Sequence, residues 1–90
     1  MDFEWDESKN NSNKSKHDIY FETAKNIFQD ENCVEIITPY PIKNRFITIG
    51  KLDRKLLTAI FTIRGNALRI ISVRRSREKE VKLYEEKYFG

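Results

Sequence analysis

The sequence contains few of the residues that form covalent or metal cross-links. Among its 90 residues there is one cysteine, Cys33, and one histidine, His17. A single cysteine cannot form an internal disulfide, and one cysteine with one histidine cannot supply the four protein ligands of a structural zinc site. We therefore expect a cytoplasmic protein that needs no metal and no cofactor.

Long apolar runs and linker-like segments are also missing. No stretch approaches the ~20 apolar residues that a membrane-spanning helix needs, so no membrane contact is expected. The acidic start of the chain does not resemble a signal peptide. Three glycines and two prolines leave no low-complexity linker, and a hydrophobic fraction of 39% is enough for one small core. We expect one domain over residues 1–90.

Charge is distributed unevenly along the chain. Residues 1–45 contain 6 Lys or Arg and 9 Asp or Glu, a balance of −3, whereas residues 46–90 contain 11 and 5, a balance of +6. The sum of the two halves is the net charge of +3. A basic second half favours an anionic partner such as RNA, and the acidic first half is left free to contact something basic.

The first part of the chain predicts one strand and two helices. Alternation of apolar and acidic residues over 3–6 indicates a short edge strand. Asp6 is the expected cap of a polar helix over 7–17, which has no apolar stripe and should be weakly anchored. Phe21, Ala24 and Phe28 share one face at helical spacing, which predicts a second helix that ends near Gln29.

The rest of the chain predicts a sheet followed by a helix. A β-rich run over 33–38 ends at Pro39 and Pro41, and residues 40–44 form a loop. Runs over 45–50, 56–64 and 68–73 have short connections, which favours an antiparallel meander. A last helix is expected over 77–88 with Ser76 as its cap. The fold class is therefore α+β.

Arginines lie at both ends of the last predicted strand. Strand parity places Arg64 and Arg74 on one face of the sheet if Ile71 and Val73 join the core, and it leaves Arg69 at the margin of the core side. Guanidinium groups match phosphate oxygens, so Arg64 and Arg74 are a candidate phosphate clamp. The simpler alternative is a solvated face that makes weak surface ion pairs.

The chain resembles the BrnT toxins of bacterial type II toxin–antitoxin modules. Three groups of residues carry the resemblance: Phe3-Glu4-Trp5-Asp6-Glu7, Lys9, Asn13, Lys16-His17, Phe21-Glu22, Ala24, Phe28 and Asp30; Arg45, Ile49-Gly50, Leu56, Thr62 and Arg64; and Arg69-Ile70-Ile71-Ser72, Arg74, Glu80 and Tyr84-Glu85. Together they span nearly the whole chain.

The resemblance implies a RelE-like fold, in which two N-terminal helices and a C-terminal helix pack on a mainly antiparallel sheet. It also implies an endoribonuclease that slows translation. The implied partner is a BrnA-like antitoxin with a ribbon-helix-helix part, which neutralises the toxin and represses the operon as a complex. Operator DNA would then be contacted only through the antitoxin.

Metal-independent RNA cleavage needs a base for the 2′-OH, positive charge at the phosphate and an acid for the leaving oxygen. The RNA supplies the nucleophile itself. Histidine is the side chain with an ordinary pKa nearest neutrality, so His17 is the expected acid or base. The other candidates are Arg64 and Arg74 at the phosphate, Glu80 and Tyr84 as acid–base or orienting groups, and Trp5, Lys9, Lys16, Arg45, Arg69, Arg75 and Arg77 as RNA contacts.

Each candidate also has a structural interpretation. His17 can cap its helix, the two clamp arginines can pair with Glu78 or Glu80, and Tyr84 lies on the apolar stripe of its helix. Two other functions stay open on sequence alone. A non-catalytic RNA- or DNA-binding module would show salt-sensitive binding without strand scission, and an interaction protein would show no affinity for nucleic acid.

Overall fold

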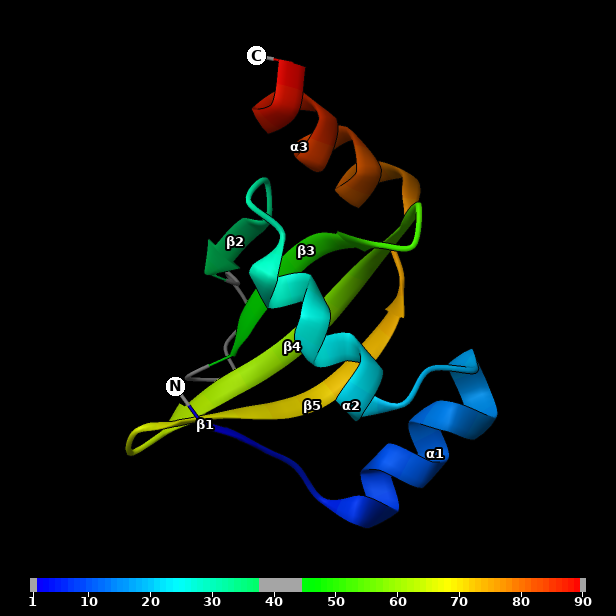
Figure 1. Ribbon diagram of the computed structural model, residues 1–90, viewed down its shortest axis with the longest axis vertical. Coiled ribbons are helices and arrows are strands. Elements are labelled where there is room, and N and C mark those ends of the chain that lie inside the picture. Colours follow the sequence, from blue (N-terminus) through cyan, green and yellow to red (C-terminus); the bar gives the residue numbers. More distant parts are fainter. Residues whose placement is uncertain (1, 38–44, 90) are drawn as a thin grey trace.

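A computed structural model describes residues 2–37 and 45–89 of the chain. Five strands form one sheet in the order β1-β5-β4-β3-β2 (Figure 1). The strands are β1 (Asp2–Glu4), β2 (Val34–Ile37), β3 (Phe46–Leu52), β4 (Lys55–Arg64) and β5 (Ala67–Arg75). β2 to β5 pair antiparallel in sequence order, and β1 pairs parallel with β5 at the edge. The predicted α+β class, edge strand and meander are confirmed. The expected loop over 40–44, with Pro39 and Pro41, lies outside the described residues.

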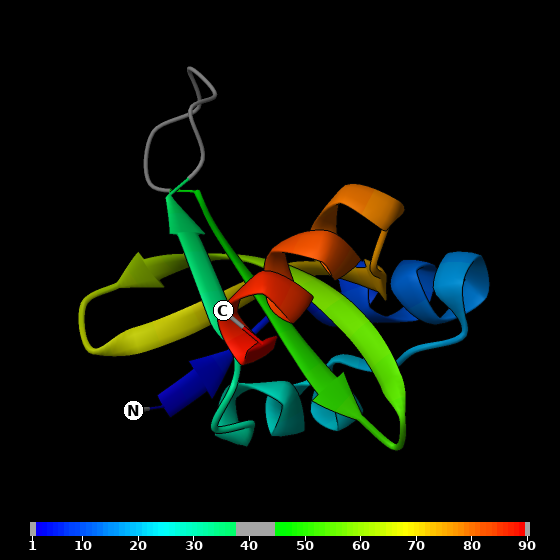
Figure 2. The same cartoon turned by 90° about the horizontal axis from the view of Figure 1, so that it is seen from above.

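Helical segments lie on both sides of this sheet. They are α1 (Glu7–His17), α2 (Phe21–Ala24), which continues directly as the 3-10 helix η1 (Lys25–Gln29), and α3 (Glu78–Phe89). Figure 2 shows the sheet between α2–η1 and α3. The expected second N-terminal helix is therefore one α-helical turn followed by a 3-10 segment. The described helices are too short or too polar to cross a membrane.

The core fills the space between α2–η1 and one face of the sheet. Its buried members are Phe21, Ala24, Ile27, Leu57, Ala59, Phe61, Leu68, Ile70 and Val73. Phe28 links the edge strand to this core, because its ring lies 5.3 Å from that of Phe3 and 5.4 Å from that of Phe61. Burial of these side chains, rather than the polar first helix, supplies most of the hydrophobic stabilisation.

A β-bulge in β5 changes the face assignment of that strand. Ile60 pairs with Ser72 and the next residue of β4, Phe61, pairs with Ile70, so Ile71 is an extra residue on β5. Ile70 is therefore buried and Ile71 only half-buried. The face assignment was conditional on Ile71 and Val73 both joining the core, and only Val73 does so. Arg69, which parity placed on the core side, pairs with Thr62 on the opposite face.

Two asparagines anchor α1, which has no apolar stripe. Asn13 accepts a hydrogen bond from the backbone N–H of Val73 at 3.0 Å and donates one to the carbonyl of Ile19 at 2.9 Å. Asn10 accepts from the backbone N–H of Phe21 at 2.8 Å. Asp6 caps the helix as predicted, since its carboxylate accepts from the N–H of Lys9. Polar contacts thus fix the helix to β5 and to the start of α2, contrary to the weak anchorage expected.

The two hairpins whose connections lie within the described residues, β3–β4 and β4–β5, use two-residue turns of different composition. The β4–β5 turn places Gly65 at φ 59°, a conformation that glycine adopts at little cost. The β3–β4 turn places Asp53 at φ 50° and Arg54 at φ 69°. Positive φ at both central residues is the pattern of a type I′ turn, where Asn-Gly or Asp-Gly is the usual pair.

Candidate active site

His17 is the last residue of α1 and lies beside the part of β5 that does not pair with β1. Its half-buried side chain lines two hollows. One is a cavity of about 270 Å³ that includes Tyr20, Leu57 and Arg75, and the other is a cavity of about 240 Å³ that includes Ile71 and Ser72. Because Asn13 fixes α1 to Val73, the position of His17 relative to β5 is set by the fold.

Cations surround His17 on both sides. Lys14, Lys55 and Arg75 line the first cavity, and Lys9 and Lys16 line the second. Arg75 is exposed, and its guanidinium makes no hydrogen bond or ion pair within residues 2–37 and 45–89. A surface of this kind attracts phosphate groups. The imidazole of His17 lies between the two groups of cations.

Lys14 is the one cation of this set that has an ion-pair partner within the described residues. It donates to the carboxylate of Asp18, one helical turn further on. That hydrogen bond raises the pKa of Lys14 and lowers the pKa of Asp18. Both groups face solvent, so the pair holds the helix end only weakly.

Arg74 of β5 and Glu80 of α3 form a bidentate ion pair. Nη1 and Nη2 of Arg74 donate to the two carboxylate oxygens of Glu80 at 2.6 and 2.7 Å. Burial would raise the pKa of Glu80, but the hydrogen bonds from Arg74 and from the backbone N–H of Arg77 outweigh it and lower that pKa. The same hydrogen bond raises the pKa of Arg74. Both terminal nitrogens of the Arg74 guanidinium therefore bind Glu80.

The N-terminus of α3 differs from the prediction. The helix begins at Glu78, so the capping position is Arg77, and its N–H donates to Glu80 at 2.7 Å. Ser76 is not the cap: its hydroxyl lies 2.8 Å from that of Thr58, and its backbone N–H donates to Leu56. Ser76 thus fastens the chain to β4 just before the helix.

The structure does not bring Arg64 and Arg74 together. Arg74 pairs across the sheet with Thr58, whereas Arg64 pairs with Ala67 at the far end of β4. The six residue-to-residue steps from Thr58 to Arg64 correspond to about 20 Å at roughly 3.3 Å per step. The expected clamp of these two arginines is therefore wrong, although both lie on the same face.

Glu4 contacts two arginines, Arg64 and Arg69, at the end of the sheet where Arg64 lies. Its carboxylate accepts from Arg69 at 2.6 Å and lies 3.8 Å from Arg64, which is largely exposed. These contacts link β1 to the hairpin between β4 and β5. Arg64 and Arg69 are thus a separate basic group, remote from His17.

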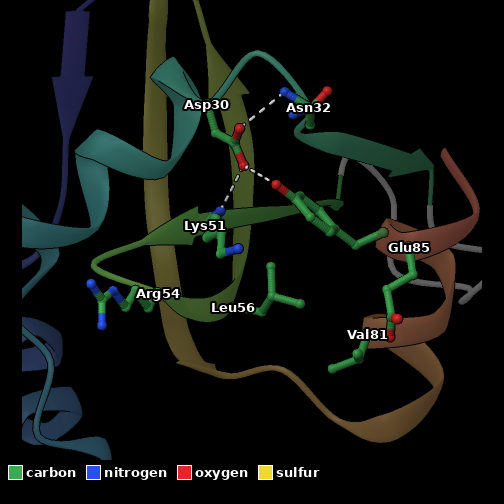
Figure 3. Close-up of a pocket in the computed structure, with 8 residues that line it drawn as sticks. Asp30, Asn32, Lys51, Arg54, Leu56, Val81 and Glu85 are labelled. Carbon is green, nitrogen blue, oxygen red and sulfur yellow. Dashed lines mark hydrogen bonds between the residues drawn. The ribbon is translucent and has the colours of Figure 1, made fainter. Parts of the chain in front are cut away.

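Tyr84 lies in a different hollow, a cavity of about 710 Å³ between α3 and the β3–β4 hairpin (Figure 3). Its buried hydroxyl donates to Asp30 at 2.7 Å. Asp30 also accepts from the backbone N–H groups of Lys51 and Asn32. Burial would raise the pKa of Asp30, but these three donors outweigh it and lower that pKa. Tyr84 therefore fastens α3 to the end of η1 and does not line either cavity beside His17.

The remaining candidates are dispersed. Trp5 donates from Nε1 to Glu7 at 2.8 Å and packs edge-on against Phe21, so its ring is part of the protein's own packing. Arg77 is exposed at the start of α3, and Arg45 is half-buried just before β3. Of the predicted RNA contacts, only Lys9, Lys16 and Arg75 lie at the hollows lined by His17.

Sequence reasoning missed the residues that position this site. Asn10 and Asn13 are buried, and their spacing of three on an otherwise polar helix was the available signal. Lys14 and Lys55 also line the first cavity. Lys55 could not be assigned from sequence, because its place opposite His17 depends on how α1 docks on the sheet.

Two comparisons with known proteins bear on this chain. Its residues 5–80 match a family model described as the ribonuclease toxin BrnT of type II toxin–antitoxin systems. A comparison with curated proteins finds no match. The matched region begins at Trp5 and ends at Glu80, so it includes His17, the basic residues beside it and the ion pair of Arg74 with Glu80. The chain belongs to the BrnT family of ribonuclease toxins of type II toxin–antitoxin systems.

Proposed function

We propose that this chain is an endoribonuclease toxin that cleaves RNA without a metal ion and thereby inhibits translation. The observation that carries the proposal is the position of His17 between two hollows lined with cations, at the edge of β5. RNA is a polyanion with its own nucleophile, so a fixed imidazole and a cationic surface supply the groups that the reaction requires.

In this proposal His17 accepts the proton of the 2′-OH as this oxygen attacks the phosphorus and then donates it to the leaving 5′-oxygen, and Arg75 stabilises the charge on the phosphate. Arg75 lines the same cavity as His17 and its guanidinium is not used elsewhere in the described structure. As charge develops on the phosphate oxygens, a nearby guanidinium lowers the energy of the transition state. Lys9 and Lys16 contact the RNA backbone on the other side of His17.

Arg74 and Glu80 are assigned as positioning residues. Their ion pair joins β5 to the start of α3, next in sequence to Arg75. The lowered pKa of Glu80 keeps its carboxylate ionised at neutral pH, where it holds Arg74 rather than exchanging protons. Arg64 and Arg69 would contact RNA only at a distance from the scissile bond, and Tyr84 supports α3 through Asp30.

The test is cleavage of RNA by the purified chain in the presence of EDTA. Cleavage should persist and leave 2′,3′-cyclic or 3′-phosphate ends. His17→Gln and Arg75→Ala should each reduce the rate about 10²-fold or more. Arg64→Ala, which removes an equally basic side chain about 20 Å from the Thr58–Arg74 pair, is the control and should change the rate little.

Three outcomes would contradict the proposal. EDTA could abolish cleavage, His17→Gln could remain fully active while folded, or Arg64→Ala could be as damaging as Arg75→Ala. Salt-sensitive binding of RNA without any strand scission would favour a non-catalytic nucleic-acid-binding module instead.

We further propose that the antitoxin implied by the family is BrnA-like, with a ribbon-helix-helix part, and that operator DNA is bound only by the complex. Co-expression with that antitoxin should restore growth and yield a co-purifying complex. The mainly antiparallel sheet with helices before and after it supports assignment to the RelE-like fold, and a cytoplasmic location follows from an RNA target. A toxin that binds operator DNA by itself would contradict this assignment of roles.

A further inference from the structure

The β3–β4 turn keeps a bulky residue where glycine would fit better. Arg54 has a φ of 69° and Asp53 a φ of 50°. The left-handed region is unfavourable for residues with a Cβ, and Asp tolerates it better than Arg because its short polar side chain can bond locally. The same chain uses Gly65 in its other described hairpin.

No contact within the described part of the protein compensates for the conformation of Arg54. Its side chain is exposed and makes no hydrogen bond or ion pair with residues 2–37 or 45–89. In Figure 3 the guanidinium points away from both Asp30 and Glu85, the acidic residues of the same hollow. A strained residue without internal contacts is a candidate for an external one.

The turn lies next to the candidate active site. Asp53 and Lys55, the neighbours of Arg54, line the cavity that contains His17. Arg54 and Lys51 line the larger cavity on the other side of the hairpin. An extended polyanion seated at His17 that continues over the hairpin tip therefore meets the guanidinium of Arg54.

We propose that Arg54 binds a phosphate of the RNA substrate outside the scissile linkage. This proposal rests on the proposed ribonuclease function and adds a substrate-binding residue to it. Arginine suits this role because its charge is permanent and its planar donors match phosphate oxygens. The strained turn directs that guanidinium outward from the hairpin tip.

The experiment compares four purified chains: wild type, Arg54→Gly, Arg54→Lys and Asp53→Gly. Each is titrated with a 2′-O-methyl RNA oligonucleotide, which cannot be cleaved, over a series of salt concentrations, and its thermal midpoint is measured. Arg54→Gly should raise the midpoint by about 2–5 °C because it relieves the turn. It should also weaken binding and reduce the slope of log K against log salt by about 0.7, the value for one phosphate contact on a single strand.

The other two variants separate charge from conformation. Arg54→Lys should keep the salt slope of wild type, since it keeps the positive charge. Asp53→Gly should raise the midpoint and keep a salt slope at least as steep as that of wild type, because it relieves the turn without removing a cation.

Two results for Arg54→Gly would overturn the proposal. One is a wild-type affinity and salt slope, and the other is a lower thermal midpoint, which would show that Arg54 serves folding. These results are distinguishable from failure of the ribonuclease function itself, which is shown by the absence of RNA cleavage by wild type whether or not the oligonucleotide binds.

Discussion

Asn13 joins two segments that are far apart in sequence through one side-chain amide. Its oxygen accepts from Val73 and its nitrogen donates to Ile19, and the side chain is buried. Removing the amide would leave a buried N–H and a carbonyl without partners, and such groups cost about 1–3 kcal/mol each. His17, four residues later on the same helix, takes its position from this contact.

We therefore predict that Asn13→Ala lowers the free energy of unfolding by about 2–4 kcal/mol, measured by urea denaturation. Asn11→Ala is the matched control, because Asn11 is on the same helix but exposed, and its loss should change stability by less than about 0.5 kcal/mol. Equal losses in the two variants would contradict a stabilising role for the bridge to β5, because alanine raises helix propensity equally at both positions.

Thr48 and Thr58 are buried threonines on adjacent strands with opposite hydrogen-bonding states. Both are fully inaccessible to solvent. Among the described residues, the hydroxyl of Thr48 has no partner, whereas that of Thr58 lies 2.8 Å from the hydroxyl of Ser76. A buried hydroxyl without a hydrogen bond destabilises the fold.

Thr48→Val should thus raise the free energy of unfolding by about 1 kcal/mol, and Thr58→Val should lower it by a similar amount. The two variants replace the same group in equally buried positions, so the opposite signs test hydrogen bonding directly. The measurement is urea denaturation of both variants. A Thr48→Val variant less stable than Thr58→Val would contradict this account.

At the scale of the secondary structure elements, η1 packs against the backbone of β3 at Gly50. A Cβ added at Gly50 would lie 2.6 Å from the carbonyl oxygen of Ile27 and 2.9 Å from its Cβ. Since the nearest atom is backbone, side-chain rotation cannot relieve the contact. Gly50 therefore sets the distance between η1 and the sheet.

Gly50→Ala should separate η1 from β3 and lower the free energy of unfolding by about 2–3 kcal/mol. Gly65→Ala is the comparison: it has open space for a Cβ but a φ of 59°, so only backbone strain of about 1 kcal/mol is expected. Amide hydrogen exchange in η1 should increase for Gly50→Ala and not for Gly65→Ala. The reverse pattern would show that packing at Ile27 is not limiting.

The helices and strands were largely predictable from sequence. Which side chains face the core, and which contacts hold the elements together, were not. Alternation and turn residues were sufficient to locate β3, β4 and β5. The bulge at Ile71 was invisible because Ile70 and Ile71 are both apolar, so an extra residue leaves the hydrophobic pattern intact. The separation of Arg64 from Arg74 follows from where each pairs along β4, and composition carries no information about that.

At the scale of the whole molecule, two carboxylates connect α3 to the sheet. Glu80 binds Arg74 of β5, and Asp30 accepts from Tyr84 of α3 and from Lys51 of β3. The hydrogen bonds to both carboxylates outweigh burial and lower both pKa values. Each carboxylate therefore binds protons more weakly in the folded state than in the unfolded state.

The sign of the resulting pH dependence follows from linkage. A lowered folded-state pKa gives stability that is fully present above the unfolded value of about 4 and is lost as the pH falls through the folded value. We expect the thermal midpoint to decrease between about pH 5 and pH 2. The double variant Asp30→Asn, Glu80→Gln should start lower and decrease less steeply.

Glu86→Gln, which changes an exposed carboxylate on α3, is the control for this measurement and should follow the wild-type curve. Differential scanning calorimetry over this pH range would contradict the assignment if the double variant lost stability as steeply as wild type.

The bond from Val73 to Asn13 has a consequence for biosynthesis. The helix that ends in His17 leaves the ribosome well before its partner on β5, because Val73 lies 60 residues after Asn13 in the chain. Likewise, β1 can pair only after residues 67–69 have emerged. A nascent chain that stops short of β5 cannot hold His17 in place, so the proposed active site can form only after residue 73 has been synthesised.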